Sequence, residues 1–109
     1  MKLLSNEIYN KVETLLREYH NCDNTIIEYI KSINEIKKFF NNSPYKEFIQ
    51  IFYFDRHKYR YRYPSNRMLF AYLCNLLHLE EPTLYNIRRE IVYKSAMIFY
   101  KNNIIEGEE

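Results

Sequence analysis

The 109-residue chain has a single glycine, three prolines and no tryptophan. Because glycine and proline form most tight turns, their scarcity argues against a sheet of many hairpins and favours long helices. One glycine also excludes a glycine-rich loop for nucleotide phosphates. No run of about 18 apolar residues is present, so the sequence predicts no membrane-spanning helix. The opening residues are too polar for a signal peptide, and we expect a cytoplasmic protein.

Cysteine is also scarce, since only Cys22 and Cys74 occur and neither has a Cys-x-x-Cys partner. A disulfide-stabilised fold is therefore not expected. Cys74 and His78 are four residues apart and could share a metal, with His57, His20 or Cys22 as further ligands. A structural zinc site needs four ligands at close spacing, so a buried thiol and a helix-end imidazole are the preferred interpretation. We predict no metal and no cofactor.

Hydrophobic residues make up 47% of the chain and charged residues 28%, which is typical of a folded domain rather than a disordered segment. The length suits one domain and is short for two. The fourteen acidic side chains are dispersed over predicted helix faces beside basic ones, a pattern typical of solubilising surface charge. We therefore do not predict an enzyme.

Apolar residues recur at helical spacing over residues 4–19 and again over 26–40. Isoleucine also suits strands, but the helical period decides for two helices. Asp23 or Asn24 is expected to cap the second helix. The short join predicts an antiparallel hairpin in residues 1–42 that packs on the remainder or dimerises. The side chains expected on the other faces of the first helix are Glu7, Lys11, Glu13, Arg17 and Glu18.

The clearest boundary is Asn41–Pro44, which is either a flexible joint or a tight corner. We favour a corner with Ser43 as N-cap and Pro44 at the first helical position. The apolar run FIQIFYF that follows suits a buried helix or a strand. Because nothing strand-like lies beside it, we predict a helix over 45–55.

Arginines and tyrosines alternate in residues 56–63, which predicts an extended segment with the two residue types on opposite sides. Such a segment could grip phosphates and sugars or stack on exposed bases, or it could be a solvated loop. Ser65 is then expected to cap a helix over 66–78.

The most informative stretch is LCNLLHLEEPTLYNIRR, residues 73–89, which predicts two short-linked helices. A DNA-reading helix-turn-helix has a small residue at its fifth position, here Cys74. The second helix opens on Pro82-Thr83 and continues to about Lys101. With Cys74 as the fifth residue, five positions of the unit should be apolar: the fourth, eighth, tenth, fifteenth and eighteenth. They are occupied by Leu73, Leu77, Leu79, Leu84 and Ile87.

One position departs from that pattern, because the ninth residue is usually a glycine with a left-handed backbone and is His78 here. Histidine tolerates that conformation better than branched residues do, at some cost. The alternative to a DNA-reading unit is an ordinary helical hairpin in an all-α core. We favour the DNA-reading unit, whose second helix enters the major groove.

The distribution of charge supports this interpretation. Residues 1–54 hold seven basic and seven acidic side chains, whereas residues 55–101 hold nine basic and four acidic ones, a balance of +5. Positive charge therefore accompanies the predicted helix-turn-helix, as phosphate binding requires. The predicted DNA-binding residues are Pro82, Thr83, Tyr85, Asn86, Arg88 and Arg89 on the second helix, and Arg56, Lys58, Arg60, Arg62, Ser65 and Arg67 before it.

Each predicted contact has a chemical reason. Asparagine pairs with adenine and arginine with guanine in the major groove, which suits Asn86 and Arg89. Arg88 is expected nearer the flank, where it would reach a phosphate. Glu81 could accept a hydrogen bond from a cytosine amine. The favoured interpretation is that its negative charge interacts with the positive end of the helix dipole.

Two segments, NEIYNKVETLLREY and LCNLLHLEEPTLYNIRREIVYKSA, resemble the ArpU/RinA-like late transcriptional regulators of phages from low-GC Gram-positive bacteria. The second segment is similar to the family's ending L-x-I-S-x-x-T-x-Y-R-x-K-x-x-A. Tyr85 lies one place from the family's usual aromatic pair, and the basic RYRY segment has no counterpart there. The residues that carry the similarity are Leu79, Thr83, Tyr85, Arg88 and Ala96.

This resemblance implies a helical hairpin followed by a domain similar to region 4 of sigma factors. It also implies activation of a late-gene promoter on double-stranded DNA, alongside RNA polymerase, in the bacterial host. We thus predict an all-α fold of four to five helices, with a helical hairpin in 1–42 and the helix-turn-helix in 43–109. A homodimer would suit a two-fold operator. The rival function is a small protein-binding module, an inhibitor or adaptor, with a surface rich in tyrosine and arginine.

Overall fold

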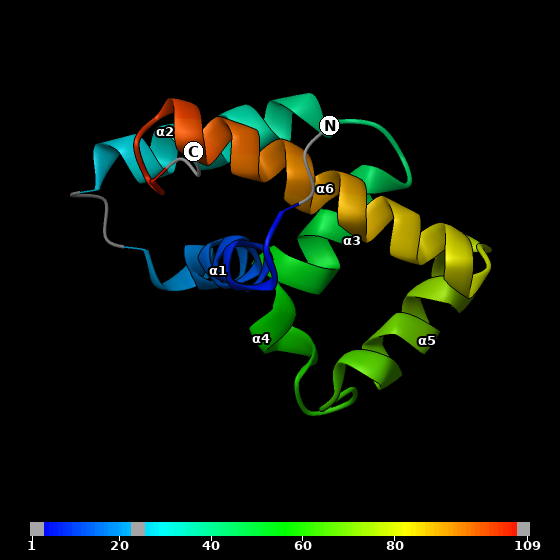
Figure 1. The fold of residues 1–109 in the computed structure, drawn as a ribbon. Coiled ribbons are helices and arrows are strands. Elements are labelled where there is room, and N and C mark those ends of the chain that lie inside the picture. Colours follow the sequence, from blue (N-terminus) through cyan, green and yellow to red (C-terminus); the bar gives the residue numbers. More distant parts are fainter. Residues whose placement is uncertain (1–3, 23–25, 107–109) are drawn as a thin grey trace.

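The long C-terminal helix α6 (Glu81–Lys101) is the element on which the other long helices pack. In the computed structural model, which describes residues 4–22 and 26–106, α6 crosses the whole molecule (Figure 1). Within those residues the chain forms six α-helices, two short helical segments and no strand, which confirms the predicted all-α class. Side chains buried against the other helices recur along most of α6. Its buried side chains are Leu84, Ile87, Ile91, Val92, Ser95, Ala96, Ile98 and Phe99.

The two N-terminal helices, α1 (Asn6–Arg17) and α2 (Ile27–Phe39), occur where the periodicity predicts them. The expected antiparallel arrangement is wrong, because Figure 1 views α1 nearly end-on while α2 runs across the picture. A one-turn segment, η1 (Glu18–Asn21), follows α1, and each long helix packs on α6. The predicted caps Asp23 and Asn24 lie outside the described residues.

The helix predicted over 45–55 is present as α3 (Tyr45–Ile49) and a π-helical continuation, η2 (Gln50–Phe54). Pro44 precedes the helix rather than opening it, and the Ser43 hydroxyl donates to the Glu47 carboxylate instead of capping the backbone. The corner is therefore tight, as expected, with the cap displaced by one residue.

One aromatic core joins the two predicted regions. The Phe52 ring lies 4.9 Å from the Phe48 ring and 5.6 Å from the Phe70 ring, which belongs to the helix over residues 66–77. Val12 and Leu16 of α1 belong to the same buried cluster. Residues 1–42 and 43–109 thus share a single hydrophobic core.

The extended segment predicted over 56–63 is wrong. Its first part is the short helix α4 (Arg56–Tyr59), and the Tyr63 N–H donates to the Tyr59 carbonyl at 2.9 Å. Tyr59 and Tyr63, four residues apart, therefore share one face and both contact the Tyr72 ring. The two-residue alternation predicts the wrong conformation, because the packing of Tyr59 and Tyr63 on Tyr72 requires helical spacing.

The turn between α5 (Asn66–Leu77) and α6 agrees closely with the sequence prediction. The Ser65 hydroxyl accepts from the Met68 N–H at 3.2 Å and caps α5 as predicted. His78 has φ 56° and ψ 43°, the left-handed conformation expected at that position, and its N–H donates to the Cys74 carbonyl. Pro82 lies in the first turn of α6.

Replacing His78 with glycine is expected to stabilise the fold by up to about 1 kcal/mol. A left-handed residue with a Cβ costs about 1–2 kcal/mol, part of which is offset by the extra entropy of an unfolded glycine. Urea denaturation measures the change. Ala71→Gly, on an exposed face of α5, is the control and should destabilise by about 1 kcal/mol. Equal losses in the two variants would contradict the left-handed turn.

Candidate nucleic-acid interface

The first turns of α6 present a row of exposed side chains. Leu84 and Ile87 point into the core, and this places Pro82, Asn86 and Arg89 on the opposite side of the helix, in solvent. We call these three residues the α6 ridge. Thr83 and Tyr85 are also exposed and flank the ridge. All five therefore lie on the surface, as the helix-turn-helix pattern predicts.

Beside the ridge, a groove of about 580 Å³ separates α5 from α6. The Tyr85 ring is 47% exposed and rests on the Phe70 ring, with 4.6 Å between centroids. Arg67 enters the groove from α5 and Glu81 from α6. The groove thus has an aromatic floor and charges of both signs.

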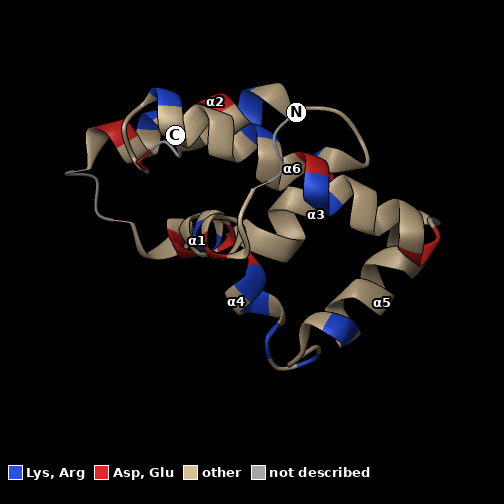
Figure 2. Cartoon of the chain, viewed as in Figure 1, with Lys and Arg blue, Asp and Glu red and all other residues tan. Residues whose placement is uncertain are grey.

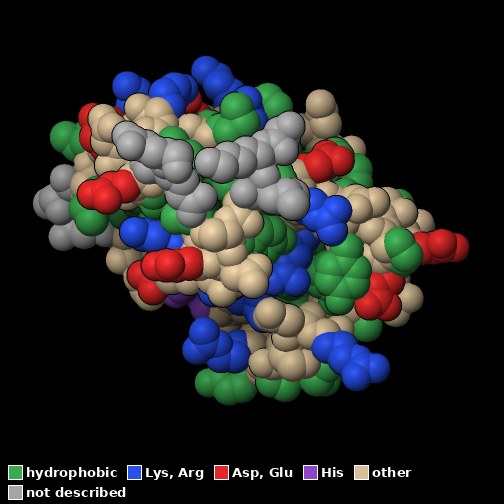
Figure 3. Space-filling model, in the orientation of Figure 1, with side chains coloured by type: hydrophobic (Ala, Val, Ile, Leu, Met, Phe, Trp, Pro, Cys, Tyr) green, Lys and Arg blue, Asp and Glu red, His purple; other side chains and the backbone are tan. Residues whose placement is uncertain are grey.

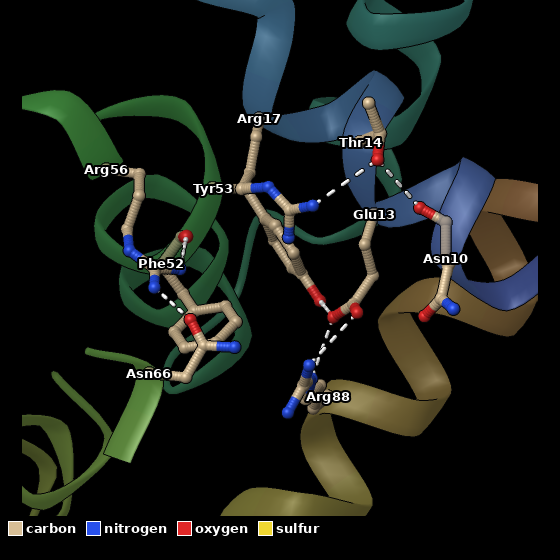
Figure 4. Close-up of polar contacts among 9 residues, drawn as sticks. All are labelled: Asn10, Glu13, Thr14, Arg17, Phe52, Tyr53, Arg56, Asn66 and Arg88. Carbon is tan, nitrogen blue, oxygen red and sulfur yellow. Dashed lines mark hydrogen bonds and ion pairs between the residues drawn. The ribbon is translucent and has the colours of Figure 1, made fainter. Parts of the chain in front are cut away.

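Arg88 lines the inner side of this groove, but it is not free to reach a phosphate as we expected. Its side chain is 18% exposed and forms a bidentate ion pair with Glu13 of α1. Arg88 Nε donates to Glu13 Oε2 at 2.7 Å, and Nη2 donates to Oε1 at 3.0 Å. Figure 4 shows the pair between the two helices. This arginine is neutralised inside the molecule, so its predicted flanking position is corrected.

The buried Tyr53 completes this network, because its hydroxyl donates to Glu13 Oε2 at 2.7 Å (Figure 4). Burial, and then the charge of Glu13, raises the pKa of Tyr53 well above its ordinary value, so the hydroxyl keeps its proton and donates. Burial alone would lower the pKa of Arg88, but the hydrogen bonds and charge of Glu13 raise it. The network is therefore a carboxylate with three charge-assisted or polar donors.

Glu13, which is only 4% exposed, is not among the site residues that the sequence predicts. It was expected on one of the other faces of α1. A signal was present, because Glu13 lies four residues after Tyr9 and three before Leu16, next to the apolar stripe. Its two partners, Tyr53 and Arg88, lie 40 and 75 residues away in the chain.

Basic side chains gather around α4 and the start of α5, at the lower edge of Figures 2 and 3. Arg60, Arg62 and Arg67 are exposed and, like Arg89, take part in none of the ion pairs among the described residues. Lys58 is exposed but pairs with Asp55, at 3.4 Å. The surface around α4 and the start of α5 therefore carries part of the positive charge that the sequence predicts for phosphate binding.

The Arg56 side chain makes contacts within the molecule rather than pointing into solvent. Its guanidinium donates to the Phe52 carbonyl at 3.3 Å and to the Asn66 side chain, and it lies over the Phe52 ring (Figure 4). Burial lowers the pKa of Arg56. The Ser65 hydroxyl is likewise engaged, as the cap of α5.

No group of three or more His, Cys, Asp or Glu side chains is placed to hold a metal ion in the described part of the chain. The His20 and His57 rings stack, 3.9 Å apart, without a third candidate ligand. None of the helices in residues 4–22 and 26–106 is long and apolar enough to cross a membrane.

Comparison with protein-family models, with curated proteins and with solved structures finds no match for this chain. The resemblance to phage late regulators therefore stays a prediction.

Proposed function

We propose that the chain binds double-stranded DNA and inserts the α6 ridge into the major groove. The observation that carries this proposal is the left-handed turn at His78. It lets Leu73, Leu84 and Ile87 pack inward while the start of α6 stays uncovered. An α-helix with one uncovered face fits the width of the major groove.

The chemistry of the ridge suits base edges. Asn86 can pair with the N6 and N7 atoms of adenine, and Arg89 with the O6 and N7 atoms of guanine. The two residues lie three apart and thus on neighbouring positions of one helix face. Thr83 and Pro82 can contact thymine methyl groups. Arg88 has no part in this, because Glu13 holds it.

Backbone phosphates would be bound by the exposed arginines of the preceding segment. Arg60 and Arg62 lie in the turn after α4, and Arg67 lies in the first turn of α5. Charge-assisted contacts of this kind fix the orientation of a protein on the duplex without reading its sequence. Two acidic residues, Glu80 and Glu81, lie at the start of α6 and would repel phosphates, so the proposed base contacts begin with the residues that follow them.

The regulatory role we propose is control of transcription, as an activator of phage late genes. It rests on the resemblance to late regulators, which also suggests RNA polymerase and a second copy of the chain as partners. A protein-binding module is the second candidate. The exposure of Phe39, at 57%, supports it, because aromatic side chains are enriched at protein interfaces.

Salt dependence tests the proposed phosphate contacts. Duplexes are selected from a random pool, and affinity is measured by fluorescence anisotropy over a range of salt concentrations. Each of Arg60→Ala, Arg62→Ala and Arg67→Ala is expected to weaken binding to all sequences and to reduce the slope of log K against log salt by about 1.

Lys31→Ala and Lys38→Ala are the matched controls, because both lysines are exposed on α2, away from the basic surface. They should leave the slope unchanged. If no duplex binds below micromolar concentration at moderate salt, the DNA proposal fails and the protein-binding module is favoured.

A further inference from the structure

Tyr61 is the most exposed large hydrophobic side chain in the described residues, at 99% of its full accessible area. It lies in the turn between α4 and α5, with Arg60 before it and Arg62 after it, both exposed. Tyrosine rings in proteins usually bury much of their surface. A ring left entirely in solvent between two arginines is a feature that core packing does not explain.

The turn that carries Tyr61 is anchored on both sides. Before it, Tyr59 packs against the Tyr72 ring of α5, with 5.9 Å between centroids. After it, Tyr63 stacks on the same Tyr72 ring at 4.6 Å. The Tyr63 N–H closes the turn on the Tyr59 carbonyl at 2.9 Å. Tyr61 therefore projects from a supported corner rather than from a loose loop.

The base of this corner is held by further contacts. The Arg56 guanidinium bridges the Phe52 carbonyl and the Asn66 side chain, so it ties α4 to the first turn of α5. The Ser65 cap fixes the point at which α5 begins. These contacts fix the two ends of the turn whose backbone carries Tyr61 and the two neighbouring arginines.

We propose that Tyr61 stacks on a DNA base that lies outside the regular base-pair stack. An aromatic ring binds any base face, whereas arginines on either side bind the phosphates next to it. This inference rests on the proposed DNA binding but concerns a different surface from the α6 ridge. A stacked Tyr61 would make the chain bind more tightly to DNA that is opened, bulged or kinked at one base-pair step.

The test uses two duplexes of the same selected sequence, one fully paired and one with a single unpaired 2-aminopurine. The full-length protein is expected to bind the bulged duplex more tightly, by roughly 5- to 150-fold, and to quench the 2-aminopurine fluorescence. Tyr61→Phe should keep the preference and the quenching. Tyr61→Ala should lose both and still bind the paired duplex as the unchanged protein does.

Phe39→Ala removes another exposed aromatic ring, on α2, and should change neither measurement. Retention of the preference or of the quenching in Tyr61→Ala would overturn the inference. Equal affinity of the unchanged protein for the two duplexes would also overturn the inference about Tyr61. In that case the proposed binding of paired DNA would still stand. Failure to bind either duplex would overturn both proposals and point to a protein partner.

Discussion

Replacing Glu13 with alanine is expected to lower the free energy of unfolding by about 3–5 kcal/mol. The substitution leaves Arg88 with its charge in a largely buried place and leaves the buried Tyr53 hydroxyl without its acceptor. Removing one partner of a buried ion pair costs far more than the pair contributes, because the remaining charge is unpaired and poorly hydrated. Urea denaturation followed by circular dichroism measures the loss.

Two further variants make this prediction specific. Glu7→Ala removes an exposed carboxylate in the first turn of the same helix and should cost no more than about 1 kcal/mol. The triple variant Glu13→Leu, Tyr53→Phe and Arg88→Met replaces the whole network by apolar groups and should recover most of the lost stability. A loss below about 1 kcal/mol for Glu13→Ala, or no recovery in the triple variant, would contradict a buried, paired network.

This network also affects the proposed function. It joins α1, η2 and α6 through one carboxylate, and Arg88 lies one residue from the ridge residue Arg89. The ion pair holds α6 against α1 and thus adds to the burial of Leu84 and Ile87, which places the ridge in solvent.

Much of the C-terminal half could be predicted from local signals. Ser65 before an apolar period, a histidine that tolerates the left-handed region, and Pro82 in a first helical turn each act within a few residues. These signals agree with one another, which is why the positions of α5 and α6 follow from the sequence. The proposed α6 ridge follows as well, from the burial of Leu84 and Ile87.

What could not be predicted depends on contacts between distant segments. The steep crossing of α1 and α2 follows from their packing on α6, which a hairpin pattern does not contain. Glu13 and Arg88 look like surface charges until α1 is placed on α6. Likewise, Tyr59 and Tyr63 follow a two-residue pattern in sequence, but Tyr72 selects the helical spacing.

The α6 ridge gives the second large expected effect. Replacing both Asn86 and Arg89 with alanine is expected to weaken binding to a selected duplex by at least about 2 kcal/mol, roughly 30-fold in Kd. Both side chains are exposed and make none of the hydrogen bonds or ion pairs found among the described side chains, so the variant should keep its stability. The loss should be largest on the selected sequence and smaller on unrelated duplexes, because base contacts carry the specificity.

The matched control is Lys31→Ala with Asn34→Ala, an exposed basic and amide pair at the same three-residue spacing on α2. The decisive measurement is the anisotropy titration of one selected duplex at moderate salt with the unchanged protein, the ridge variant and this control. We expect the unchanged protein and the control to bind below about 1 µM and the ridge variant to bind at least roughly 30-fold more weakly. Equal binding by all three proteins, or binding by none, would contradict the assignment of α6 as a DNA-reading helix.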